Sequence, residues 1–249
     1  MHFHLPKPLH GWRALAGEIG IIVVGVLIAL GAQQVAEDWH QRAELRDAEA
    51  AMTSELRDDD LPQAYTRAAI TRCYADQLDS IESAIASGDR TRVLALARAY
   101  APVIRTWDDQ AWQAALASQV LAHSGAKRML DWANAYVLIP ALSQGGKEEQ
   151  DELALLRPMM SGKGPLSAAQ QDRLLRVTSV LRRDNERMTG GSLVFINFAR
   201  NQGLTLTGPK KTAILTEARG KYGTCVEPPA PERINLRTQL TGTEARPID

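Results

Sequence analysis

Aromatic residues and cysteines are scarce in this sequence, and neither sign of charge is in excess. The chain has 249 residues, of which 5% are Phe, Trp or Tyr and two are Cys. Its 29 Lys and Arg balance 29 Asp and Glu, so no basic field attracts nucleic acid and no acidic field selects a basic partner. The alternating apolar and polar runs typical of strands are missing as well. We therefore expect an all-α protein that does not bind nucleic acid.

The motifs of common enzyme chemistries are also missing. There is no Walker loop, no dinucleotide-binding fingerprint and no G-x-S-x-G elbow. Ser124 and Lys127 match S-x-x-K, a signature of penicillin-recognising hydrolases, but its companion motifs S-D-N and K-T-G do not occur. The five histidines are not accompanied by carboxylates or thiols in a metal-binding pattern. The sequence thus identifies no catalytic, cofactor-binding or metal-binding residue.

One long hydrophobic run lies near the N-terminus. Every residue from Ile19 to Ala32 is Ile, Val, Leu, Ala or Gly. A helix from Leu15 to Val35 would be roughly 30 Å long, which is the thickness of the hydrocarbon core of a bilayer. Trp12 and Trp39 flank the run at positions where indole side chains prefer the lipid headgroups. Glu18 lies near one end, where it can reach the headgroups or the positive end of the helix dipole. These features predict a transmembrane helix.

Two alternatives to an uncleaved anchor remain open, a cleaved export signal and a buried core helix. Lys7 and Arg13 resemble the charged start of an export signal, and Ala29 to Gly31 place small residues where a signal peptidase cleaves. Beyond the run, however, the sequence continues as a polar, helix-favouring stretch without a helix breaker. We therefore favour an anchor over residues 15–36.

The basic residues next to the run divide almost evenly between its two sides, so their distribution does not predict which side faces the cytoplasm. A short N-terminal flank stays inside readily, whereas a long C-terminal part is translocated largely regardless of its charge. We expect residues 1–14 to be a short cytoplasmic flank and residues 37–226 an α-helical domain outside the cytoplasm, reached through a helical stalk. Residues 227–249 are predicted to be a disordered tail, because they have early prolines and no hydrophobic periodicity.

Small residues within the run would let two such helices approach each other closely. Gly25 and Ala29 are four positions apart, as are Ala16 and Gly20, and this spacing is typical of helix contacts in membranes. Glycine is common in membrane spans anyway, so the spacing alone does not establish self-association. The predicted partner is the lipid bilayer, with a second copy of the chain or another membrane protein as an additional partner.

The two cysteines, Cys73 and Cys225, are expected to form a disulfide bridge if the domain faces an oxidising compartment. In the chain-entropy model, closing so large a loop stabilises the fold by about 5 kcal/mol, which is an upper figure. The alternative is two unrelated reduced thiols.

Hydrophobic spacing and capping residues divide the rest of the domain into helices. The stalk helix is predicted to break at Arg57–Pro62, where Asp60 would cap the next helix. A loop is predicted at Ser143–Gln150, a capping box at Ser167–Gln170 and a weak point at Gly190–Gly191. The predicted helices cover residues 62–86, 89–100, 107–124, 127–143, 151–160, 167–201 and 209–220.

Five of the few aromatic residues lie in one third of the chain: Tyr100, Trp107, Trp112, Trp132 and Tyr136. Aromatic side chains often line ligand pockets, so these five are the candidates for the pocket of a solute-binding sensor domain. At helical spacing, aromatic residues more often belong to a core, and core packing is the favoured interpretation.

The segment LPKPLHGWRALAGEIGIIVVGVLIALGAQQVAEDWHQRAE resembles the N-terminus of a family of uncharacterised bacterial membrane proteins. In that family a basic flank precedes G-E-[IV]-G-I-[IV]-V-x-G-V-L-I-A-L-G-A, which Gly17–Ala32 match. The pieces ELRDDDLPQAY, RTWDDQAWQAALAS, LIPAL, LRRDNERMTGG and KYGTCV are similar too. The resemblance implies a single span, and cysteines at the positions of Cys73 and Cys225. It carries over no catalytic residue.

Together these features predict a protein of the bacterial inner membrane whose C-terminal domain faces the periplasm. An anchor followed by helices without clustered titratable residues favours a non-catalytic interaction or scaffold module. A solute-binding sensor domain is the second interpretation, and a hydrolase based on the S-x-x-K match is the third.

Overall fold

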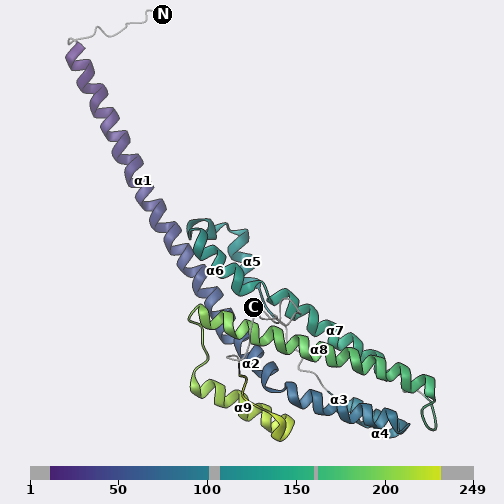
Figure 1. Ribbon diagram of the computed structural model, residues 1–249. Coiled ribbons are helices and arrows are strands. Elements are labelled where there is room, and N and C mark those ends of the chain that lie inside the picture. Colours follow the sequence, from purple (N-terminus) through teal and green to yellow (C-terminus); the bar gives the residue numbers. More distant parts are fainter. Residues whose placement is uncertain (1–11, 101–106, 160–161, 231–249) are drawn as a thin grey trace, which may run out of the picture.

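The computed structural model describes residues 12–100, 107–159 and 162–230, and these residues form helices joined by turns, with no strand among them. The all-α class predicted from the sequence is therefore confirmed. Figure 1 shows one long helix, α1 (Trp12–Ser54), that projects from a domain of packed helices. At 1.5 Å per residue its 43 residues span roughly 65 Å.

The apolar half of α1 is exposed along its whole length. Residues 16–37 are all exposed, and Leu27 and Ile28 keep 62% and 67% of their surface. Of the described helices this is the one long and apolar enough to cross a bilayer, and its most apolar window is 0% buried. A core helix would bury these side chains, so that interpretation of the run is wrong. The domain begins to cover α1 only at Asp38.

The chain remains helical where α1 ends. Glu55–Asp60 form a π-helical turn, η1, and α2 (Leu61–Ala69) follows directly. The N–H of Leu61 donates to the carbonyl of Leu56, five residues earlier instead of four. In a regular α-helix the ring of Pro62 would clash with the carbonyl four residues before it, and a π turn relieves this clash.

The predicted break at this point is therefore wrong. The proposed capping role of Asp60 is wrong as well, because its side chain makes no capping hydrogen bond. The sequence contains the proline that disturbs the helix, but the disturbance is absorbed by one wider turn.

The other helices pack around α2 and α8. A short turn joins α3 (Thr71–Ala86) to α4 (Arg90–Ala99), and Asp89 caps α4 by accepting the N–H of Arg92 at 3.0 Å. The predicted capping box of α8 is confirmed, with Ser167 and Gln170 each bonding the backbone of the other. The remaining elements are α5 (Gln110–Ala117), η2 (Val120–His123), α6 (Ala126–Tyr136), α7 (Ile139–Met159), α8 (Ala168–Asn201), α9 (Gly208–Tyr222) and η3 (Gly223–Cys225).

Glycines allow α7 and α8 to approach each other closely. A Cβ atom on Gly191 would lie 2.8 Å from Cδ2 of Leu142, and one on Gly145 would lie 2.7 Å from Sδ of Met188. The predicted loop at Ser143–Gln150 is wrong, because α7 continues through it. Each glycine is about 1 kcal/mol less favourable than alanine in a helix, and packing between the two helices outweighs this cost.

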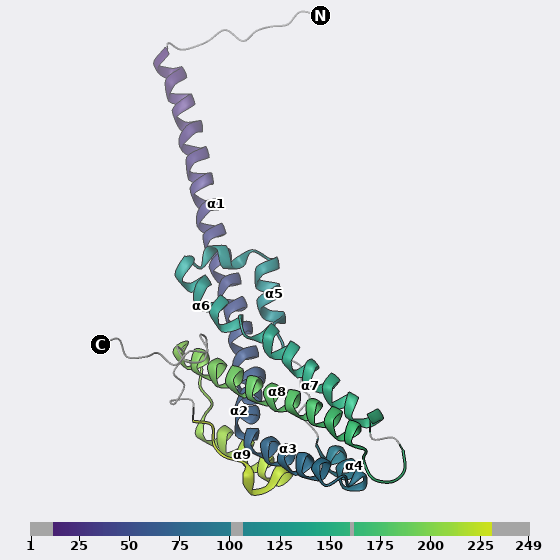
Figure 2. The same cartoon turned by 45° about the vertical axis from the view of Figure 1, so that its right-hand side comes forward.

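The buried side chains form two hydrophobic clusters, and α8 contributes to both. The upper cluster surrounds the base of α1 and includes Met52, Tyr136 and Phe195. The lower cluster lies between α3, α4 and the first half of α8 and includes Tyr74 and Leu174. Figure 2 shows α7 and α8 running side by side from the base of α1 to the α3–α4 end of the domain.

Some predictions fall on residues that the structure does not describe. Of the flank, residues 1–11 lie outside the described residues. Thr106, which the sequence predicts to cap the helix of residues 107–124, lies outside them as well. The predicted tail is described only as far as Ala230. Its first residue, Glu227, is attached to the domain, since its N–H donates to the carbonyl of Ala69 at 3.1 Å.

Candidate functional site

The predicted anchor residues lie on the free half of α1. Glu18, Gly25, Ala29 and Trp39 are exposed, and Trp39 keeps 70% of its surface. No atom of the domain lies within 4 Å of the position that a Cβ would take on Gly25. The backbone of Trp12 is helical. The face that carries Gly25 and Ala29 is thus free of the domain.

The base of α1 is joined to α6 by polar contacts around two glutamates. Glu49 is 8% exposed and accepts from Arg128 at 2.5 Å and from the indole N–H of Trp132 at 3.4 Å. Further along the chain, Glu55 is the first residue of the η1 turn. Its Oε1 accepts a hydrogen bond from the hydroxyl of Tyr136 at 2.8 Å. Burial, followed by the carboxylate of Glu55, raises the pKa of Tyr136 above its ordinary value. These contacts fix the direction in which α1 leaves the domain.

The π turn buries one carboxyl group. Asp60 is 1% exposed, and its Oδ1 accepts the backbone N–H of Asp108 at 3.4 Å, whereas its Oδ2 has no hydrogen-bond partner. Burial raises the pKa of Asp60 to about 8, and the nearby carboxylate of Glu55 adds to this effect. Asp60 therefore carries a proton at neutral pH.

A buried ion pair joins α2 to α7 at the centre of the domain. Nη2 of Arg67 lies 3.0 Å from Oε1 of Glu149, and the two side chains are 5% and 4% exposed. The hydroxyl of Tyr100 donates to the same carboxylate at 3.4 Å, and the guanidinium lies 4.7 Å from the centre of the Tyr74 ring. Burial raises the pKa of Glu149, and the charge of Arg67 opposes that rise. Sequence reasoning missed this pair, because the two residues are 82 positions apart.

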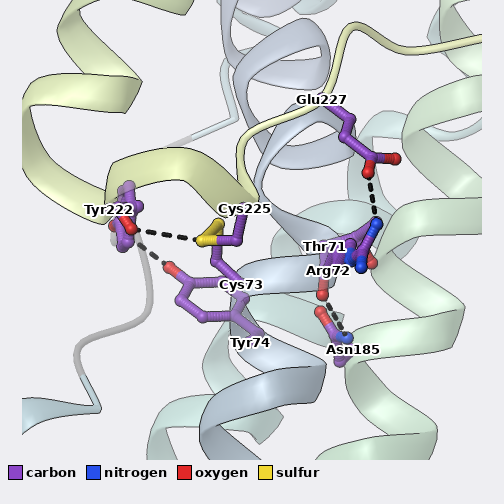
Figure 3. Close-up of a disulfide and its surroundings, with 8 residues drawn as sticks. All are labelled: Thr71, Arg72, Cys73, Tyr74, Asn185, Tyr222, Cys225 and Glu227. Carbon is purple, nitrogen blue, oxygen red and sulfur yellow. Dashed lines mark hydrogen bonds and ion pairs between the residues drawn. A yellow bond between two sulfur atoms is a disulfide. The ribbon is translucent and has the colours of Figure 1, made fainter.

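The two cysteines are joined in the structure, as Figure 3 shows. Cys73 on α3 and Cys225 in η3 have sulfur atoms 2.11 Å apart and are separated by 152 positions. Next to the bridge, the Tyr74 and Tyr222 hydroxyls lie 3.2 Å apart, and the Arg72 guanidinium pairs with Glu227 at 2.5 Å. The last described segment is thus held to α3 by a covalent bond and by polar contacts on both sides of it.

The five aromatic candidates do not surround one cavity. Tyr100 belongs to the lower cluster, where its ring centre lies 5.3 Å from that of Tyr74. The other four belong to the upper cluster or pack against it. Trp107 meets Phe195 edge to face, and Trp112 stacks on Tyr136 at 5.4 Å. The structure therefore places most of these residues in the core.

Trp132 differs from the other four, because it lines an open hollow between α6 and the end of α8. The hollow has a volume of about 690 Å³ and also contains Ser124 and Lys127 of the S-x-x-K match. The hydroxyl of Ser124 donates to the carbonyl of Leu121 at 2.7 Å. A serine nucleophile needs its hydrogen bond directed to a base, so this geometry gives no support to a hydrolase. The lining residues are Thr53, Ser124–Arg128, Asp131, Trp132, Gln202 and Leu204.

Among the residues that the structure describes, no three His, Cys, Asp or Glu side chains come together in a way that could hold a metal ion. The buried titratable groups named above are instead bonded to neighbouring helices or, for Asp60, to the segment before α5. Comparison with known protein families, with curated proteins and with solved structures gives no match for this chain.

Proposed function

We propose that this protein is a membrane-tethered scaffold that holds a helical interaction domain at the surface of the bacterial inner membrane, on the periplasmic side. The observation that carries the proposal is the exposure of the apolar half of α1. Ten Ile, Val and Leu side chains between Ile19 and Val35 are exposed in the structure. An exposed apolar surface that encircles a helix is stable in lipid and not in water.

The rigid connection of α1 to the domain supports a tether that also holds the domain in a fixed position relative to the membrane. Helix α1 continues from the apolar half into the upper cluster without a flexible linker. Glu49 of α1 and Glu55 of the adjoining η1 turn both bond to α6. A scaffold needs a fixed geometry between membrane and interaction surface, and a continuous helix provides it at 1.5 Å per residue.

The disulfide bridge supports an oxidising compartment for the domain. Bridges between distant cysteines persist in the periplasm, whereas the cytoplasm keeps thiols reduced. A periplasmic domain places the N-terminus of α1 in the cytoplasm, which agrees with the translocation of long C-terminal segments.

The location is tested by fractionation and by a reporter fused to the C-terminus. We expect the intact protein in the membrane fraction, with an N-terminus that precedes the apolar run, and a periplasm-specific reporter that is active. A mature N-terminus near Ala32 would show that the run is a cleaved signal and would overturn the tether. A reporter active only in the cytoplasm would overturn the orientation.

The scaffold role is tested by crosslinking in native membranes followed by capture of the protein in detergent. We expect a defined protein partner that is crosslinked in stoichiometric amounts. Recovery of the protein alone at all crosslinker concentrations would contradict the scaffold.

The second candidate function is a solute-binding sensor domain, and the hollow beside Trp132 is the observation that favours it. An indole ring next to Arg128 and Asp131 combines an apolar wall with charged groups, as small-molecule sites do. A metabolite that binds there should raise the melting temperature of the protein, and Trp132→Ala should abolish the rise. The absence of any shift across a broad metabolite set would leave the scaffold as the better explanation.

A further inference from the structure

The elbow formed by α5, η2 and α6 is the part of the domain that lies nearest to the apolar half of α1. Figures 1 and 2 both show the elbow beside α1, at the end of the domain that points toward the free half of that helix. Both α5 and η2 pack against α1, and Val120 and Leu121 of η2 are buried. On α1 the partly covered stripe consists of Asp38, Gln41, Leu45 and Ala48.

The position of this stripe sets the height of the elbow above the bilayer. The predicted span ends at residue 36, and Gln41 lies five residues further, which is about 7.5 Å along the helix axis. The polar layer of a bilayer is roughly 5–8 Å thick on each side, since the bilayer measures about 40–45 Å with headgroups and about 30 Å without them. The top of the elbow therefore lies at the height of the lipid headgroups.

The chemistry of the elbow fits that layer. The elbow, residues 110–136, contains one acidic residue, Asp131, and includes His123, Lys127 and Arg128. Arg128 is paired with Glu49, whereas Lys127 is exposed. Met129 and Leu130 follow and are 40% and 61% exposed. A cation beside exposed apolar side chains is typical of segments that lie in the membrane interface.

The first charged residues of the stalk are acidic. Glu37 and Asp38 are the charged residues of α1 that directly follow the span, and both repel lipid phosphates. Arg42 lies six residues beyond the span, about 9 Å along the helix axis, and is exposed, so attraction to anionic headgroups comes from Arg42 and from the elbow together.

We propose that the tip of the elbow lies in the headgroup layer of the bilayer that holds α1, with Lys127 against the lipid phosphates. This inference rests on the proposed membrane tether and adds a second contact with the membrane. Because the elbow lies on one side of α1, this contact selects the direction in which α1 tilts and brings the domain down onto the membrane surface.

The test uses the full-length protein in nanodiscs whose lipids carry a nitroxide quencher in the headgroup. A bimane dye is attached to one introduced cysteine, since both native cysteines are held in the bridge. Ala122→Cys places the dye at the tip of the elbow, and Ala86→Cys places it on another exposed alanine at the far end of α3. Trp39→Cys reports on insertion of α1 itself.

We expect strong quenching of the dye at positions 39 and 122 and little at position 86. Quenching at position 39 with none at position 122 would overturn the elbow contact while leaving the tether intact. No quenching at position 39 would overturn the tether and with it the elbow contact.

The role of Lys127 is tested in the same nanodiscs with and without phosphatidylglycerol. Loss of one positive charge near an anionic surface costs about 1 kcal/mol, which is roughly a fivefold change in an equilibrium. We expect Lys127→Glu to lower the ratio of docked to undocked elbow by at least that factor in the anionic lipid. Lys163→Glu, at an exposed site far from the elbow, is the matched control. Equal quenching in both variants would overturn the assignment of Lys127.

Discussion

Two arginines in the middle of the apolar half of α1 should release the protein from the membrane. Ten exposed Ile, Val and Leu side chains lie between Ile19 and Val35. Each favours insertion by about 0.3–0.6 kcal/mol, so together they contribute roughly 3–6 kcal/mol. An Arg near the centre of a span costs about 2.5–3.5 kcal/mol. Val24→Arg with Leu27→Arg therefore costs roughly 6–8 kcal/mol once the two lost apolar side chains are included, and insertion becomes unfavourable.

The assay is extraction of isolated membranes with alkaline carbonate, followed by detection of the protein in pellet and supernatant. The wild type should remain in the pellet, and the double variant should appear in the supernatant. Ala50→Arg with Ala51→Arg is the matched control, because it adds the same charges at exposed positions of α1 beyond the predicted span. Release of the wild type by carbonate, or retention of the Val24/Leu27 variant, would refute the energetic reasoning.

Three further predictions concern the domain. Cys73→Ser with Cys225→Ser should lower the free energy of unfolding by up to about 5 kcal/mol, the loop-closure figure for 152 residues, as measured by denaturant unfolding; a loss below about 1 kcal/mol would contradict it. Gly191→Ala gains about 1 kcal/mol of helix propensity but loses about 1–3 kcal/mol to overpacking, because its Cβ would lie 2.8 Å from Cδ2 of Leu142, so the fold should be destabilised by up to about 2 kcal/mol. Gly146→Ala meets no atom within 4 Å and should be neutral or stabilising by about 1 kcal/mol. Asp60 has a folded pKa of about 8 against about 4 unfolded, so its proton stabilises the fold fully below pH 4 and the contribution is lost as the pH rises toward 8. In the wild type, the free energy of unfolding should therefore fall by at most about 1.4 kcal/mol per pH unit in that window, and Asp60→Asn should remove this fall. A pH profile of thermal unfolding that is the same in the variant would show that Asp60 is ionised in the fold.

Four buried titratable side chains hold parts of the domain together. The Arg67–Glu149 pair, Asp60 and Tyr136 are all buried. The pair joins α2 to α7, Tyr136 donates to Glu55, and Asp60 accepts the backbone N–H of Asp108 in the segment before α5. Replacing one member of a buried pair is strongly destabilising, by about 3–5 kcal/mol, because the remaining charge is left unpaired. These residues therefore hold α1, α2, α6 and α7 in one arrangement.

Local sequence was sufficient for the features that depend on neighbouring residues. The helical class, the unbroken apolar run of Ile19–Ala32, the capping box at Ser167 and Gln170 and the cap at Asp89 all follow from composition, from spacing or from a bond between residues three apart. The pairing of Cys73 with Cys225 was also accessible, because only two cysteines are present and one pairing is available within the chain.

The tertiary structure decided what depends on residues that are distant in the chain. Pro62 disturbs the helix in any context, but packing of Met52 and Leu56 in the upper cluster keeps the chain helical through a π turn. Gly145 and Gly191 disfavour a helix locally, yet each lets the other helix pack closely. Whether an aspartate is solvated or buried is likewise set by the helices around it, since burial depends on partners that local periodicity does not specify.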